Sequence, residues 1–160
     1  MNRPTDNVTI ENAKLIFKDF SGERNPYGND KTFGIALDRE TWEKMGAEGW
    51  NVKMRPPRED GDEPLYFIKV KVVFGKVPPK IVLIDGGSGK KQVLDDQTVK
   101  LLDWVTPKNV DVIIRPYNYD FGGRTGTAAY VKTLYVTGAV DPLDEKYSDY
   151  PEEGELGWSE

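Results

Sequence analysis

The sequence contains no cysteine and no histidine. The absence of cysteine excludes disulfides, thiol catalysis and zinc–thiolate sites, and it is compatible with a reducing cytoplasm. The absence of histidine removes the usual proton shuttle near neutral pH and the commonest nitrogen ligand for zinc, copper or iron. Any catalysis would therefore depend on carboxylates, lysine, tyrosine or a hard metal ion such as magnesium. We expect a protein that is not an enzyme and that carries no cofactor.

Long apolar runs are missing as well. No run approaches the roughly eighteen residues that span a bilayer, and residues 1–14 lack the apolar core of a secretory signal. Of the 160 residues, 38% are hydrophobic and 31% are charged, which is typical of one globular domain. We therefore expect a cytoplasmic protein with no membrane partner.

The acidic charge is concentrated at one end of the chain. The net charge is −5, but residues 141–160 alone carry eight acidic residues and one lysine, a net charge of −7 that leaves residues 1–140 at +2. This asymmetry predicts a folded domain over residues 1–140, followed by an acidic interaction tail over residues 141–160. Because the tail has few aliphatic residues with which to form a core, we expect it to be disordered.

Apolar and polar residues alternate along most of the body, which predicts a mainly β fold. In the clearest strand, Leu65–Phe74, one face carries Phe67, Lys69, Lys71 and Val73, and the opposite face carries Tyr66, Ile68, Val70, Val72 and Phe74. Short helices are expected over residues 39–47, with Asp38 as the N-cap, and over residues 95–104. The other strands are expected at Val8–Phe20, where Ala13, Leu15 and Phe17 share a face, and at Thr32–Leu37, Trp50–Met54, Lys80–Ile84, Asn109–Tyr119 and Gly126–Val140. We predict an antiparallel barrel resembling the OB fold, with two short helices.

A glycine-rich turn joins the last two predicted strands, and Ile113–Val136 is unusually rich in aromatic and basic residues. Aromatic rings that stack on bases, set among cations that bind phosphates, are typical of proteins that bind single-stranded nucleic acid. The alternative is that these aromatic residues belong to the core or to strand edges, since Tyr and Phe favour strands in any case. Alternation places Arg115, Tyr117 and Tyr119 on one surface. Tyr130 shares a face with Leu134, so its ring either joins the core or faces a ligand.

Two loops resemble known ligand-binding motifs but lack their spacing. The glycine loop at residues 86–91 lacks the Gly and Ser/Thr spacing of a phosphate-binding loop, and we interpret it as a basic hairpin tip. The acidic loop at residues 59–63 lacks the spacing of a calcium loop. We therefore predict a nucleic-acid-binding groove formed by Lys53, Arg55, Phe67, Lys69, Lys71, Arg115, Tyr117, Tyr119, Phe121, Arg124, Tyr130 and Lys132.

The acidic tail ends in a short segment with a single large apolar residue. An acidic segment with an aromatic tip can lie on a cationic groove of its own chain, and it can dock on basic partners once DNA displaces it. The alternative is a tail that only solubilises the protein. The residues predicted to bind partners are Glu152, Glu153, Glu155 and Trp158.

Four segments of the chain look familiar together: Glu11–Phe17, Gly49–Lys53, Pro78–Asp85 and Leu102–Thr137. With them, the sequence resembles the phage-encoded single-stranded DNA-binding proteins, a family with an OB fold and an acidic C-terminal tail. The resemblance implies coating of single-stranded DNA in phage replication and recombination, in the cytoplasm of the host, and contact with replication or recombination proteins through the tail. Many tails of this family place Phe at or next to the end, whereas here Ser159 and Glu160 follow Trp158.

Two other functions remain open from the sequence: a phage structural or adaptor β-domain, and a magnesium-dependent nuclease. The sequence does not distinguish a monomer from a homodimer or another oligomer, and it does not distinguish DNA from RNA as the ligand.

Overall fold

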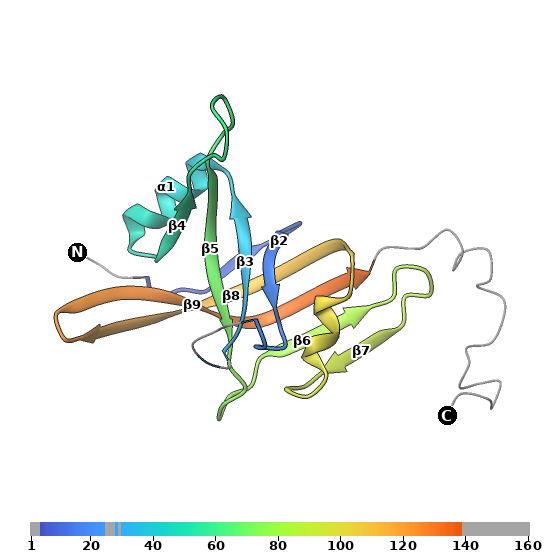
Figure 1. Ribbon diagram of the computed structural model, residues 1–160. Helices are drawn as coiled ribbons and strands as arrows, with labels where there is room; N and C mark the ends of the chain where they lie inside the picture. Colours follow the sequence, from blue (N-terminus) through green and yellow to red (C-terminus); the bar gives the residue numbers. More distant parts are fainter. Residues whose placement is uncertain (1–3, 25–27, 29, 139–160) are drawn as a thin grey trace, which may run out of the picture.

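The computed structural model describes residues 4–24, 28 and 30–138. Within this part of the chain the protein forms one nine-stranded sheet, one α-helix and one short 3-10 helix (Figure 1). The elements in chain order are β1 (Val8–Ile10), β2 (Lys14–Asp19), β3 (Lys31–Leu37), α1 (Arg39–Glu48), β4 (Val52–Arg55), β5 (Leu65–Val72), β6 (Lys80–Ile84), β7 (Lys91–Leu94), the 3-10 helix η1 (Val99–Asp103), β8 (Pro107–Phe121) and β9 (Arg124–Gly138). The predicted tail, including its partner-binding residues, lies outside the described residues.

The strands follow the order β1-β8-β9-β5-β3-β2, with β4 added to β5, β6 added to β9 and β7 added to β6. Neighbouring strands are antiparallel, except that β9 runs parallel to both β5 and β6. The predicted mainly β, OB-fold-like body is confirmed. The predicted antiparallel barrel differs from the structure in the parallel pairs of β9 and in its closure: the sheet is open, because β1 and β2, at the two ends of the order, do not pair with each other among the described strands.

The path of the chain between β1 and β2 explains why the sheet stays open. The predicted strand Val8–Phe20 is interrupted at Asn12, whose φ of 52° lies in the left-handed region that Asn tolerates better than most residues. As a result β1 pairs with β8, whereas β2 pairs with β3. The N–H of Ala13 donates to the carbonyl of Val110 at 2.8 Å. A backbone turn therefore connects β1 and β2, the two ends of the sheet, whereas a closed barrel would join its two ends by a ladder of hydrogen bonds.

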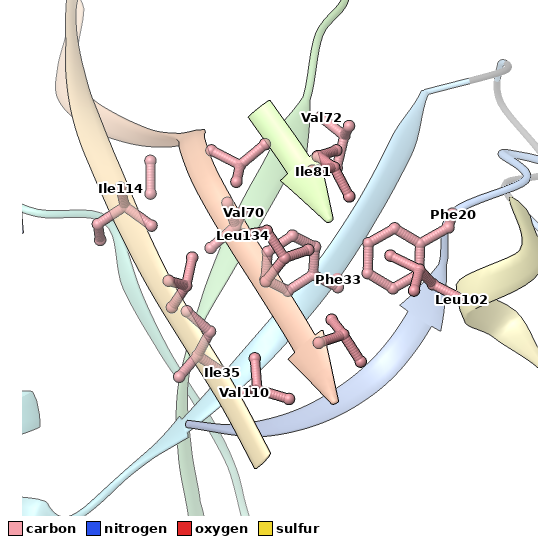
Figure 2. Close-up of a cluster of buried hydrophobic side chains, with 14 of the residues drawn as sticks. Phe20, Phe33, Ile35, Val70, Val72, Ile81, Leu102, Val110, Ile114 and Leu134 are labelled. Carbon is pink, nitrogen blue, oxygen red and sulfur yellow. The ribbon is translucent and has the colours of Figure 1, made fainter. Parts of the chain in front are cut away.

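The core lies on one face of the sheet. Alternate apolar residues of β3, β5, β8 and β9 point into it, together with residues from β6 and η1, and the rings of Phe20 and Phe33 stack with their centroids 5.1 Å apart (Figure 2). The largest fully buried side chains are Phe20, Phe33, Ile35, Ile68, Ile81, Leu102, Ile114 and Leu134. The predicted core face of β5 is confirmed, and the opposite face of this strand is available for a ligand.

The first predicted helix is confirmed as α1. The Asp38 carboxylate accepts the N–H of Thr41 at 2.6 Å, and this bond lowers the pKa of Asp38. The second predicted helix is a 3-10 helix, and it begins later than expected because Asp95 and Thr98 first form a hydrogen-bonded turn. Trp104, which follows η1, is 82% exposed.

The described helices are too short and too polar to cross a membrane. The glycine loop joins β6 and β7 as a hairpin, as predicted, with Ile84 paired to Lys91.

Candidate nucleic-acid interface

The face of the sheet opposite the core carries the predicted cations. In β5 the side chains of Phe67, Lys69 and Lys71 point away from the core, and the residues between them are buried. Lys53 of β4 pairs directly with Phe67, and directly paired residues share a face. Two neighbouring hollows of about 550 and 460 Å³ lie on this face, and Lys53 and Lys69 line both of them. The two hollows therefore form one groove.

One end of the groove is formed by two stacked rings, Tyr117 of β8 and Tyr130 of β9, which we call the tyrosine pair. Their centroids are 5.1 Å apart and their planes are within 10° of parallel. The Arg115 guanidinium lies 5.1 Å from the centroid of the Tyr130 ring, where a cation is attracted to the ring face. Tyr117 is 46% exposed, so part of its ring is available to a base.

A bulge in β9 decides which way Tyr130 points. The pairing between β8 and β9 skips Lys132, which makes this lysine an extra residue in the strand. Val131 and Leu134 are both buried, on either side of the bulge. Strict alternation, which placed Tyr130 on the face of Leu134, therefore fails here. Tyr130 instead pairs with Arg115 and lies on the groove side.

Tyr119 is held by a network that the sequence did not reveal. The Asn51 side-chain amide donates to the Tyr119 hydroxyl at 2.9 Å, and its oxygen accepts the N–H of Thr127 at 3.2 Å. The Tyr119 ring crosses Gly126 so closely that a Cβ there would lie 2.5 Å from the Tyr119 hydroxyl oxygen. Tyr119 also lies against Phe121, with centroids 6.3 Å apart, and both rings line the 460 Å³ hollow. Glycine at residue 126 is thus required for this arrangement.

The other end of the groove contains a second aromatic pair, Phe17 of β2 and Phe67 of β5, which we call the phenylalanine pair. The two rings meet edge to face with centroids 5.3 Å apart, and the Arg55 guanidinium lies 4.5 Å from the Phe17 centroid. The predicted position of Phe17 on the core face with Leu15 is wrong. The register of β2 shifts between Ile16 and Asp19, and Phe17 has a φ of 48°, so the bulge turns its ring outward.

Contacts between β2 and η1 hold this bulge. The Lys18 ammonium donates to the carbonyls of Leu102 and Val105 at 3.1 and 2.8 Å, and its partial burial lowers the pKa of Lys18. The Asp103 carboxylate accepts the N–H groups of Phe20 and Ser21 at 2.8 and 3.0 Å. These bonds satisfy backbone N–H groups that follow the bulge and carbonyls at η1, and they tie the bulge to this helix.

The predicted residues do not all meet in the groove. Arg124, at the hairpin tip, and Lys132, in the β9 bulge, are exposed and line neither hollow. Lys71 lines the 460 Å³ hollow and lies 4.0 Å from the Asp30 carboxylate. Sequence reasoning missed Phe17, Lys18, Arg24 and Asn51, because a bulge and a turn bring them to the groove. Among the described residues, no group of three or more acidic side chains is placed to hold a metal ion.

Comparison with solved structures shows a shared fold. The single-stranded DNA-binding protein from bacteriophage Enc34 matches 94% of this chain over 89% of its own length, with a TM-score of 0.51 and 10% identity. The same phage protein in complex with single-stranded DNA matches 86% of this chain over 89% of its own length, with a TM-score of 0.52 and 8% identity. At such low identity the likeness extends to the fold alone.

No curated protein matches the sequence significantly. A family model does: the one described as "Putative phage ssDNA-binding domain" matches residues 1–156, which is nearly the whole chain. An open OB-fold-like sheet with a groove of aromatic and basic residues is the surface that such a domain requires. The chain belongs to this family of phage single-stranded DNA-binding domains.

Proposed function

We propose that the protein binds single-stranded DNA without sequence preference, by stacking bases on the tyrosine pair and holding phosphates with the lysines of the groove. The observation that carries the proposal is the half-exposed Tyr117 ring beside Lys53, Lys69 and Lys71 on one face of the sheet. Every base offers a π-face, so stacking tolerates any sequence, and a lysine attracts any phosphate. Neither contact reads the edge of a base.

Titration with fluorescently labelled oligothymidylate tests the proposal. Fluorescence anisotropy should report binding that weakens with salt, because phosphate contacts release counterions, and that changes little for a mixed-sequence oligonucleotide. Failure of the wild-type protein to bind at low salt would overturn the proposal. A strong preference for one sequence would refute the stacking mechanism.

We also propose that the protein is not an enzyme. Asp19 is the one carboxylate among the described residues that line the groove, and hydrolysis of a phosphodiester by two metal ions would need several carboxylates converging on the DNA. Incubation of end-labelled DNA with the protein and magnesium should leave the DNA intact. Degradation that stops when a chelator is added would show a nuclease instead.

The division of the chain into a DNA-binding domain at residues 1–140 and an acidic tail at residues 141–160 is a further part of the proposal. The tail carries a net charge of −7, so it is attracted to the same lysines that hold phosphates. The tail occupies the empty groove and in this way competes with DNA. Once DNA displaces it, the tail recruits replication or recombination proteins, in the cytoplasm of the host cell, through Glu152, Glu153, Glu155 and Trp158.

Deletion of residues 141–160 should therefore increase the affinity for oligothymidylate at low salt. The matched control replaces the tail with a neutral Gly/Ser segment of the same length, which should bind as tightly as the deletion variant. If both variants bind like the full chain, the tail does not compete for the groove.

A further inference from the structure

The phenylalanine pair has no role in the function proposed above. Phe17 is nonetheless 45% exposed, although phenylalanine is among the residue types that are most often buried. Its ring lines the 550 Å³ hollow, and it also lines a third hollow of about 510 Å³ beside the β4–β5 loop. The Phe17 ring therefore stands between two open spaces, and a planar ligand can approach it.

The surroundings of Phe17 are basic on its groove side. Arg24, Lys53 and Lys69 line the 550 Å³ hollow. The third hollow is mixed in charge, because Asp62 and Glu63 line it together with Arg55 and Arg58. Asp19 is 6% exposed, and its carboxylate is occupied by the N–H of Arg24 and the hydroxyl of Ser21. An aromatic ring among guanidinium and ammonium groups is suited to binding a nucleotide, because the base stacks on the ring and the phosphate binds the cations.

The backbone at Phe17 also indicates a binding role. A φ of 48° places this residue in the left-handed region, where the Cβ of any residue other than glycine is crowded. If the bulge served only to bend β2, a glycine would occupy the position with less strain. The chain instead keeps a large ring there, facing out of the core, and fixes the bulge through Lys18 and Asp103. Strain of this kind is typical of positions that hold a side chain for a ligand.

We infer that the phenylalanine pair is a second base-stacking site, and that one strand of DNA runs along the groove from the tyrosine pair to Phe17. This inference rests on the proposed function. Lys53 and Lys69 line both hollows, so the same two ammonium groups contact the phosphates between the two stacking sites. The strands that carry the path, β2, β3, β5 and β4, lie side by side and meet the β8–β9 hairpin (Figure 1).

Oligothymidylates of increasing length separate the two sites. Lengths from about four to about sixteen nucleotides cover the range that one OB fold binds. A short oligonucleotide occupies either pair, so Phe17→Ala or Tyr117→Ala alone should change its affinity by less than about threefold, because the intact pair still binds it. A long oligonucleotide occupies both pairs. Each variant should then lose roughly five- to a hundredfold in affinity, and the double variant should lose the product of the two factors.

Two control variants keep the result interpretable. Phe17→Tyr retains the ring and should bind like the wild type, and Trp104→Ala removes an exposed aromatic residue that lines none of the three hollows. Thermal unfolding of each variant shows whether the fold is intact. If Phe17→Ala destabilises the protein, the comparison is repeated with Phe17→Leu, which keeps an apolar side chain but removes the ring.

The outcomes distinguish this inference from the function on which it rests. If Phe17→Ala or Phe17→Leu binds every length like the wild type while Tyr117→Ala weakens long oligonucleotides, the second site is refuted and the proposed function stands. If the wild-type protein binds no length, the proposed function fails and the inference fails with it. A loss on long oligonucleotides alone, restored by Phe17→Tyr, supports the second site.

Discussion

The tyrosine pair and the phenylalanine pair lie on the same face of one sheet, but the backbone produces them in different ways. The tyrosine pair lies in a long hairpin, in which Tyr117 follows the alternation of β8 and the bulge at Lys132 places Tyr130 on the same side. The phenylalanine pair comes from a bulge, in which Phe17 leaves the alternation of its strand. The first arrangement is supported by many ladder hydrogen bonds, and the second by a few contacts to η1. A bulge thus contributes to both pairs, but only the tyrosine pair is anchored on both sides of its bulge by a long ladder.

The largest expected effect is the loss of the exposed ring of the tyrosine pair. Tyr117→Ala should weaken the binding of long oligothymidylate by about 1–3 kcal/mol, the usual value of one base stacked on an aromatic ring. Tyr117→Phe keeps the ring and should bind like the wild type. Fluorescence anisotropy measures both affinities. An unchanged affinity in Tyr117→Ala, with the fold intact, would remove this residue from the site.

Gly126→Ala tests the support on the tyrosine side alone. The new Cβ would lie 2.5 Å from both the Tyr119 hydroxyl oxygen and the Asn51 side-chain oxygen, so at least one of these side chains must move. Overpacking of this kind costs about 1–3 kcal/mol of stability. Chemical denaturation should show this loss, together with weaker DNA binding. Gly75→Ala is the matched control, because the nearest atom to its Cβ would be 3.9 Å away; equal stability of the two variants would contradict the tight packing at Gly126.

Asp103→Ala tests the support on the phenylalanine side. The N–H groups of Phe20 and Ser21 lose their acceptor, which should lower the free energy of unfolding by about 1–3 kcal/mol. The affinity for long oligonucleotides should fall with it, and the affinity for short ones should not. Asp103→Asn keeps one acceptor oxygen and should recover part of both losses. A loss of stability with unchanged DNA binding at all lengths would show that the bulge does not serve the site.

Lys69→Ala acts on the segment between the two pairs, and its effect should appear mainly in the salt dependence. Loss of one phosphate contact should reduce the slope of log affinity against log salt by about 0.7 for single-stranded DNA. Lys100→Ala removes an exposed lysine of η1 that does not line the groove, and its slope should match that of the wild type. Identical slopes for Lys69→Ala and the wild type would place the phosphates elsewhere.

Asp38→Ala should have the smallest effect on DNA binding, because Asp38 contacts neither the tyrosine pair nor the phenylalanine pair. The hydrogen bond from Thr41 lowers the pKa of Asp38 in the folded state. The cap therefore contributes stability above the unfolded pKa of about 3.9, and this contribution is lost as the pH falls through the lower folded pKa. The melting temperature of the variant should be slightly below that of the wild type at neutral pH and should approach it in acid, with DNA affinity unchanged. A difference in melting temperature that grows in acid would contradict this sign.

Much of the fold could be predicted from the sequence, because most strands alternate regularly. The faces of β5 and of the outgoing half of the hairpin were predicted correctly, and with them the positions of Lys69, Arg115 and Tyr117. The errors come from single residues that break the period. The turn at Asn12 divides the predicted first strand into β1 and β2. The bulges in β2 and β9 place Phe17 and Tyr130 in the groove.

These exceptions depend on distant partners that a pattern along the chain does not contain. The β2 bulge is held by Asp103, more than eighty residues away, and Tyr119 is held by Asn51, at a separation of 68 residues. Alternation with a period of two residues does not predict an extra residue in a strand. Such a residue can lie on either face of the sheet until the residue that it packs against is known. The aromatic residues of the hairpin could therefore be proposed as a site, but the phenylalanine pair could not.

The short junction between β5 and β9 has a consequence for the stability of the sheet when DNA binds. The two strands are joined by only two residue pairs among those described, Val70 with Ala129 and Lys71 with Tyr130, and the second pair consists of groove residues. On the inferred path, a strand of DNA that contacts both pairs of rings would cross this short junction and link the two parts of the sheet. Ligand that binds only the folded state raises its stability by mass action. Slower amide hydrogen exchange around Ala129 in the complex would show that bound DNA stabilises this junction.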